Sequence, residues 1–177
     1  MPRIHLAALI AVVVLAFAVL GRPTAGGPIL PSEKKTEDVV LCLAKVRQVE
    51  IVVAHLAPQL RAAGLSEEDI KARWTKRLTE EHFEVADGKG YSKLLLRNVT
   101  TLDQDVPNAV AYAFVSRFEQ AVRVERLNQT LFLPTYSETL LRLETNAHLG
   151  HAAMVNVNRA IELFIAAVKK ADAAKTE

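Results

Sequence analysis

The sequence of 177 residues contains one cysteine, Cys42, so it cannot form a disulfide bond within a single chain. Stability must then come from burial, and we expect large apolar faces on the folded elements. Cys42 falls within an apolar stripe, which favours a buried role as a small hydrophobic side chain. A disulfide between two copies through Cys42 is the alternative.

The chain also has no excess of positive charge outside its amino-terminal segment. The whole chain has 22 Lys and Arg against 20 Asp and Glu, and residues 1–26 hold two of the bases, Arg3 and Arg22, and none of the acids. The remainder therefore has 20 of each sign. Proteins that bind nucleic acid normally carry extra basic residues, so we expect no nucleic-acid partner.

The first 26 residues have the pattern of a secretory signal peptide. Arg3 precedes an unbroken apolar run from Leu6 to Leu20, and small residues follow up to Gly26. The run is 15 residues long, shorter than the roughly 18 needed to span a bilayer. These features predict a cleaved leader, a secreted, extracellular protein and no transmembrane anchor. Residues 27–35 are expected to be a flexible lead-in to a single domain over residues 36–177.

An apolar stripe with alternating steps of three and four residues predicts a helix from Thr36 to about Leu60. Thr36 is the expected N-cap, and Pro58 is expected to kink or end the helix. The stripe consists of Val39, Cys42, Val46, Val49, Val53, Leu56 and Leu60.

A second helix is predicted over residues 67–85. Ser66 is a suitable N-cap, and the acids that follow it favour the positive end of a helix. Ile70, Trp74 and Leu78 form an inner row at four-residue spacing. The charged residues around Trp74 indicate a solvated outer face.

Three further elements complete the predicted fold. Residues 91–106 suit a helix or a strand, and the neighbouring helices favour the helix. A helix over residues 108–132 has an inner row of Ala111, Phe114, Val115, Phe118 and Val122. A last helix of about 38 residues runs from Glu138, and Gly150 within it permits a bend or the close approach of a neighbour.

Short connections between these segments make successive helices antiparallel neighbours. The sequence thus predicts an all-α protein, an up-down bundle of four to five amphipathic helices.

The sequence lacks the common catalytic motifs, including G-x-S-x-G and H-E-x-x-H. Glu144, His148 and His151 are weak metal-ligand candidates because this spacing places them on one helical face. We expect no catalytic residue, cofactor or bound metal. The sequons at Asn98 and Asn128 predict glycosylation at the surface.

These observations favour a secreted, non-enzymatic protein that acts by protein–protein recognition, with a protein partner or receptor. The alternative is an extracellular carrier that holds a lipid or another apolar small molecule inside the bundle. A hydrolase or metal enzyme is the least favoured class.

Overall fold

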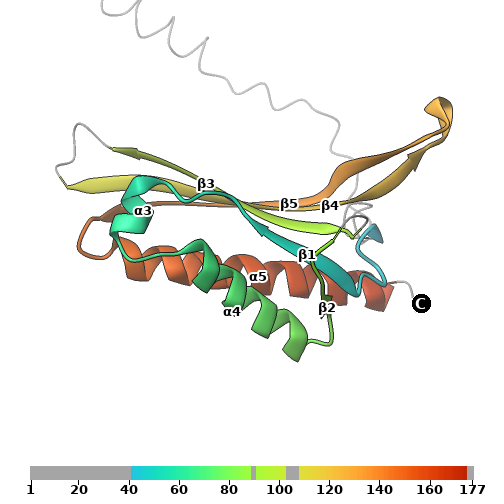
Figure 1. The fold of residues 1–177 in the computed structure, drawn as a ribbon, viewed down its shortest axis with the longest axis horizontal. Coiled ribbons are helices and arrows are strands. Elements are labelled where there is room, and N and C mark those ends of the chain that lie inside the picture. Colours follow the sequence, from blue (N-terminus) through green and yellow to red (C-terminus); the bar gives the residue numbers. More distant parts are fainter. Residues whose placement is uncertain (1–40, 89–90, 103–107, 175–177) are drawn as a thin grey trace, which may run out of the picture. The chain divides into compact units, whose positions relative to one another are not determined.

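The computed structural model describes residues 41–88, 91–102 and 108–174, which form a five-stranded sheet with two long helices on one of its faces (Figure 1). The order of the strands across the sheet is β2-β1-β3-β4-β5. About two-fifths of the described residues are in strands, so the prediction of an all-α bundle is wrong. The elements are β1 (Gln48–Val53), α3 (Pro58–Ala62), α4 (Glu67–Glu80), β2 (Glu84–Val85), β3 (Lys93–Leu102), β4 (Ala109–Val124), the 3-10 turn η1 (Glu125–Leu127), β5 (Gln129–Thr145) and α5 (Leu149–Ala174).

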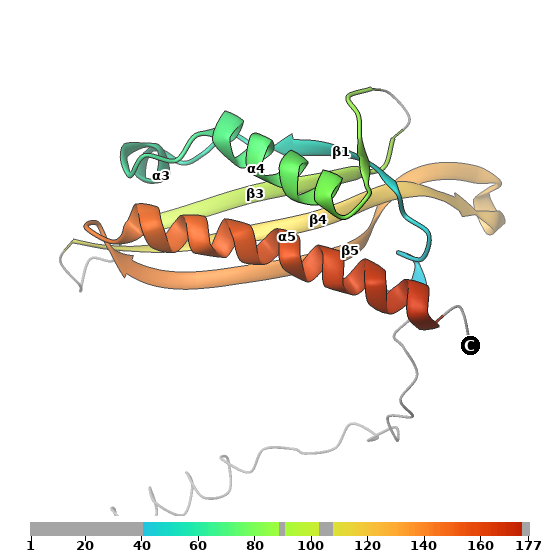
Figure 2. The ribbon, with the colours of Figure 1, turned by 90° about the horizontal axis from the view of Figure 1, so that it is seen from below.

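The sheet is mixed. Strand β1 pairs in parallel with β2 and β3, whereas β3, β4 and β5 form an antiparallel meander. Figure 2 shows α5 running along β4 and β5, with α4 beside β1. The core therefore lies between one face of the sheet and these two helices.

The segment predicted as a helix over residues 36–60 contains strand β1. Val49 and Ile51 are buried and point to the helices, because alternate residues of a strand face the same side. Cys42 is exposed in the turn before β1, which corrects its expected burial. The expected N-cap, Thr36, lies outside the described residues.

The predicted helix over residues 108–132 is in fact strand β4, the turn η1 and the first residues of β5. Val110, Tyr112, Phe114 and Phe118 are at most 1% exposed and alternate with half-buried residues. This two-residue period places one apolar face of β4 against the helices. Residues 93–102 are likewise a strand, so the strand alternative is correct for this segment.

Helix α4 confirms the predicted start and inner row of the helix over residues 67–85, but it ends at Glu80, and residues 84–85 form strand β2. The hydroxyl oxygen of Ser66 accepts a hydrogen bond from the backbone nitrogen of Asp69 at 3.0 Å, as expected for an N-cap. Ile70, Trp74 and Leu78 are fully buried along one face.

The predicted last helix, by contrast, is correct only in its second part. Residues 129–145 are strand β5, and α5 begins at Leu149. Phe164 of α5 is fully buried and contacts the rings of Phe118 and Tyr136 in the sheet and of Phe83 beside β2. None of the described helices is long and apolar enough to span a membrane.

Candidate protein-binding surface

One face of the sheet is covered by α4 and α5. The other face consists of the outward-pointing residues of β3, β4 and β5, and we call it the open face. Cross-strand register places these residues in three adjacent rows. The rows are Arg97–Val115–Thr139, Val99–Ala113–Leu141 and Thr101–Ala111–Leu143.

Large apolar side chains project from the open face into solvent. Leu141 is 76% exposed, Val99 is 64% exposed and Leu143 is 51% exposed. The solvated face of an antiparallel sheet is normally polar. A contiguous apolar patch with a polar border is instead typical of a surface that binds a partner.

Charged residues border this patch near the start of β3. Arg117 and Glu119 continue the outward face of β4, and Lys93 lies opposite Glu119 on β3. The ammonium of Lys93 is 3.7 Å from a carboxylate oxygen of Glu50 on β1. The open face thus has an apolar end and a charged end, an arrangement that resembles the core and rim of a protein interface.

Strand β5 is an edge strand of the described sheet, since β4 is the only strand that pairs with it there. Its free backbone N–H and C=O groups can pair with another extended chain. This edge borders the open face along Thr139, Leu141 and Leu143.

Beyond Glu119 the β4–β5 hairpin continues as a two-stranded ribbon over residues 120–133, because β3 ends opposite that residue. A shift of register at Phe118/Glu119 separates the ribbon from the flat part of the sheet. Leu127 and Phe132 of the ribbon are 50% and 48% exposed. The ribbon is thus a second apolar surface, apart from the open face.

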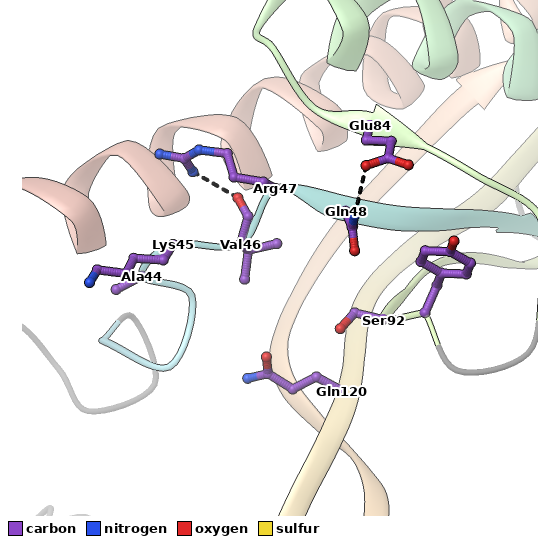
Figure 3. A pocket seen from close by; sticks show the side chains of 9 residues that line it. Ala44, Lys45, Val46, Arg47, Gln48, Glu84, Ser92 and Gln120 are labelled. Atoms are coloured by element: carbon purple, nitrogen blue, oxygen red, sulfur yellow. Dashed lines mark hydrogen bonds between the residues drawn. The ribbon is translucent and has the colours of Figure 1, made fainter.

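A polar cleft of about 530 Å³ opens beside the start of β1 (Figure 3). The side-chain nitrogen of Gln48 donates a hydrogen bond to a carboxylate oxygen of Glu84, with an N–O distance of 2.6 Å. Tyr91, Ser92 and Gln120 also line the cleft. The residues that line the cleft include neither histidine nor cysteine.

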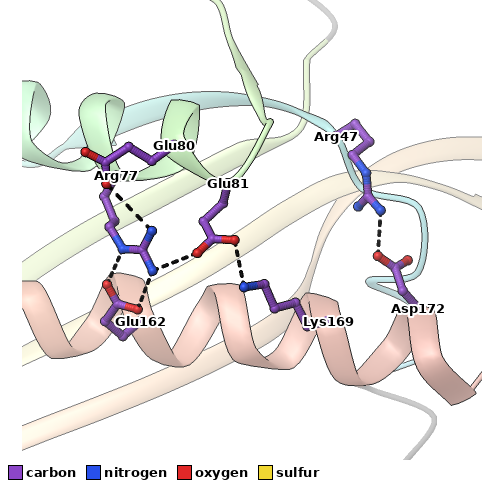
Figure 4. Close-up of polar contacts among 7 residues, drawn as sticks. All are labelled: Arg47, Arg77, Glu80, Glu81, Glu162, Lys169 and Asp172. Carbon is purple, nitrogen blue, oxygen red and sulfur yellow. Dashed lines mark hydrogen bonds and ion pairs between the residues drawn. The ribbon is translucent and has the colours of Figure 1, made fainter.

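Ion pairs join the two helices on the covered side of the sheet (Figure 4). Arg77 of α4 binds Glu162 of α5 through two hydrogen bonds and is 2.8 Å from Glu81, which also binds Lys169 at 2.7 Å. The hydrogen bond from Arg77 lowers the pKa of Glu162, and those from Lys169 and Arg77 lower the pKa of Glu81. These carboxylates stay ionised and hold the helices together.

The three candidate metal ligands lie in different secondary-structure elements. Glu144 lies on β5, where it contacts Arg142 at 3.2 Å, His148 lies in the following turn, and His151 lies on α5. The shared helical face on which this candidate site depended therefore does not exist. Within the described ranges, no group of three or more His, Cys, Asp or Glu side chains could hold a metal ion.

The two sequons lie in different settings. The side-chain oxygen of Asn98 accepts from the backbone nitrogen of Ala57 at 2.8 Å, and its amide nitrogen donates to the carbonyl of His55 at 3.1 Å. Asn98 therefore fixes the loop between β1 and α3. Asn128 is exposed at the tip of the ribbon, in the left-handed region with φ 48°. Glycosylation at either position stays a prediction.

The helical interpretation placed Ala111 and Val115 of the open face on the inner row of the helix predicted over residues 108–132, and Leu141 was not singled out. The signal that could have located them is the alternation on β4, where every second residue from Val110 to Phe118 is buried. Once this strand is recognised, its partners on β3 and β5 follow from antiparallel pairing.

No protein-family model matches the chain, and no curated protein matches its sequence significantly. Solved structures with weak similarity to the chain include two bacterial lipoproteins. A crystal structure of a minor lipoprotein from Acinetobacter baumannii is 10% identical, with a TM-score of 0.37, over 73% of this chain and 95% of that one. A solution structure of uncharacterized lipoprotein B from Nitrosomonas europaea is 12% identical, with a TM-score of 0.25, over 73% and 82% of the two chains. Likenesses this low carry no argument about function.

Proposed function

We propose that this chain is an exported, non-catalytic binding protein that recognises a protein partner through the open face of its sheet. The exposure of Leu141 and Val99, in one row across three strands, is the observation that carries the proposal. Burying this patch in an interface removes apolar surface from water, at about 25 cal/mol per Å².

A protein fits this surface better than a lipid. Thr101, Thr139 and Arg97 lie among the apolar side chains of the open face, and their polar groups need hydrogen-bonding partners when they are covered. The free backbone groups along β5 need the same. A polypeptide supplies both kinds of partner, whereas hydrocarbon tails supply neither.

Nothing in the described part of the chain favours the carrier alternative. Trp74, Phe118 and Phe164 are each fully buried and fill the space between the helices and the sheet. An apolar ligand in this space would have to displace packed side chains, and filling a well-packed core further costs about 1–3 kcal/mol.

Site-specific photo-crosslinking in the natural host tests the proposal. A photoreactive residue is placed at Leu141 or at Val99, and the matched control is Val155, which is 44% exposed on the opposite, solvent side of α5. We expect one polypeptide to be trapped from both open-face positions and not from Val155, and the identified protein, once purified, to bind the purified chain. Lipid adducts alone, or equal trapping from Val155, would contradict the proposal.

A further inference from the structure

The edge of strand β5 is self-complementary. The residues around Leu140 read Glu138-Thr139-Leu140-Leu141-Arg142, with one acid and one base equally far from the central leucine. Glu138, Leu140 and Arg142 share the inward face of β5, because their partners on β4 are the buried residues Ser116, Phe114 and Tyr112.

We propose that two copies of this chain join edge to edge through β5, in an antiparallel pairing with Leu140 of each copy on the twofold axis. Glu138 of each copy then lies opposite Arg142 of the other, so one register forms two opposite-charge pairs. The contact is isologous, as expected for a twofold dimer. Residues 135–145 of each copy pair in this register, and the five strands of each copy join in one continuous sheet.

Charge favours this register over its neighbours. With Thr139 on the axis, Glu138 would face Leu140 and Arg142 would face Tyr136, so no opposite-charge pair would form. With Leu141 on the axis, Glu138 would face Glu144 of the second copy, and with Arg142 on the axis the two arginines would face each other. Like charges directly opposite destabilise a strand pair. A register centred on Leu143 brings Arg142 opposite Glu144 but pairs only residues 141–145. The contact that Arg142 already makes with Glu144 leaves further N–H donors of its guanidinium free for Glu138 of the second copy.

Apolar contacts support the same register. Leu140 is half-buried and packs against the core, and the pairing places its exposed part against Leu140 of the second copy. On the open face, Leu141 lies opposite Thr139 of the second copy and diagonal to its Leu141, within reach across paired strands. The two open faces thereby become one surface. This inference goes beyond the proposed function, because it assigns self-association to the edge of β5, whereas the proposed function concerns partner binding by the open face.

The dimer is tested by reversing the charge at Glu138 or at Arg142 and by mixing the two variants. The mass of the purified chain in solution is measured by analytical ultracentrifugation for the natural protein, Glu138→Arg, Arg142→Glu, and an equimolar mixture of the two variants. Each variant alone places like charges at both pairs, and we expect its dimer dissociation constant to rise by about tenfold or more. In the mixture, two arginines of one copy face two glutamates of the other, so dimers should return.

Recovery in the mixture also shows that the variants fold, since an unfolded variant could not restore the pairing. Lys76→Glu on the exposed side of α4 is the matched control and should leave the mass unchanged. A natural protein that stays monomeric at high concentration, or variants that dimerise as well as the natural chain, would overturn the inference. In either case the cross-links from Leu141 would persist if the partner proposal holds, so the two failures are distinguishable.

Discussion

The indole nitrogen of Trp74 on α4 donates a buried hydrogen bond to the main-chain carbonyl of Val157 on α5, with an N–O distance of 3.1 Å. This bond joins the two helices that cover the sheet. Trp74 is fully buried, so its donor has no access to water. The pairing of α4 with α5 therefore depends on a polar contact as well as on apolar packing.

Replacing Trp74 by Phe should lower the free energy of unfolding by roughly 1–3 kcal/mol, because the carbonyl of Val157 loses a partner inside the core. Urea denaturation followed by circular dichroism measures the change. Arg73→Ala, at the exposed neighbouring position, is the control and should change the free energy by less than about 0.5 kcal/mol. Equal stability of the two variants would contradict the packing described for α4 and α5.

Gly150, near the start of α5, lies close to the backbone of Ala63, the residue that follows α3. A Cβ atom at this position would lie 2.3 Å from the carbonyl oxygen of Ala63, so Gly150→Ala forces the backbones apart. We expect a loss of about 1–3 kcal/mol in unfolding free energy, typical of overpacking. Thermal denaturation checks this value, and a stabilised variant would show that α5 does not approach α3 so closely.

Asn98 should contribute to stability through its side chain. Asn98→Ala leaves the backbone nitrogen of Ala57 and the carbonyl of His55 without their partners, and we expect a cost of about 1–3 kcal/mol. Asn128→Gly, at the other sequon, keeps the left-handed backbone and should be close to neutral. Denaturation of both variants, produced without glycans, tests this difference. A neutral Asn98→Ala would mean that the loop after β1 is not held by this side chain.

The ion pairs between α4 and α5 predict a loss of stability in acid. The pKa values of Glu81 and Glu162 are lowered in the folded state, mainly by hydrogen bonds from Lys169 and from Arg77 respectively. Carboxylates with a lowered pKa stabilise the fold above their unfolded pKa, and that contribution disappears as the pH falls through the folded pKa. The natural chain should therefore be more stable than Arg77→Met at pH 7 and should lose this advantage by pH 3.

Urea denaturation at the two pH values measures the advantage, which we expect to be modest because these groups are largely solvated. Lys76→Met, one residue away on the exposed side of α4, is the control and should show no such change with pH. A difference between Arg77→Met and the natural chain that stays constant from pH 7 to pH 3 would contradict the proposed role of the ion pairs.

Local signals in the sequence were sufficient for the start and the buried row of α4. Ser66, the acids after it and the four-residue spacing of Ile70, Trp74 and Leu78 all act within a few residues of each other. The N-cap and the inner row were therefore both correct. Helices stabilised by such local contacts are the elements that a single sequence predicts best.

The strands depend on partners that are distant in the sequence. Phe114 and Phe118 are four residues apart, so they fit a helical row as well as a strand, and only the alternation of Val110, Tyr112 and Phe114 separates the two interpretations. In residues 138–174 the three-four spacing runs without interruption through the end of β5, a turn and α5. Spacing alone could not reveal the boundary, because pairing of β5 with β4 determines the conformation there.

The open face could not be predicted for a related reason. Apolar residues such as Val99 and Leu143 are normally assigned to a core, and they are recognised as exposed only when it is known which face of the sheet the helices cover. The prediction of the function class, which is recognition without a dedicated reactive group, depended less on the fold. It remains the proposal that the described geometry supports best.

The affinity of the purified partner for open-face variants is the most direct test of the account. Once cross-linking from Leu141 has identified the partner, calorimetry compares the natural chain with Leu141→Lys and with Val155→Lys on the outer side of α5. We predict that Leu141→Lys folds normally and weakens binding by about tenfold or more, while Val155→Lys binds like the natural chain. Unchanged affinity of Leu141→Lys would contradict the claim that the open face of the sheet is the binding surface.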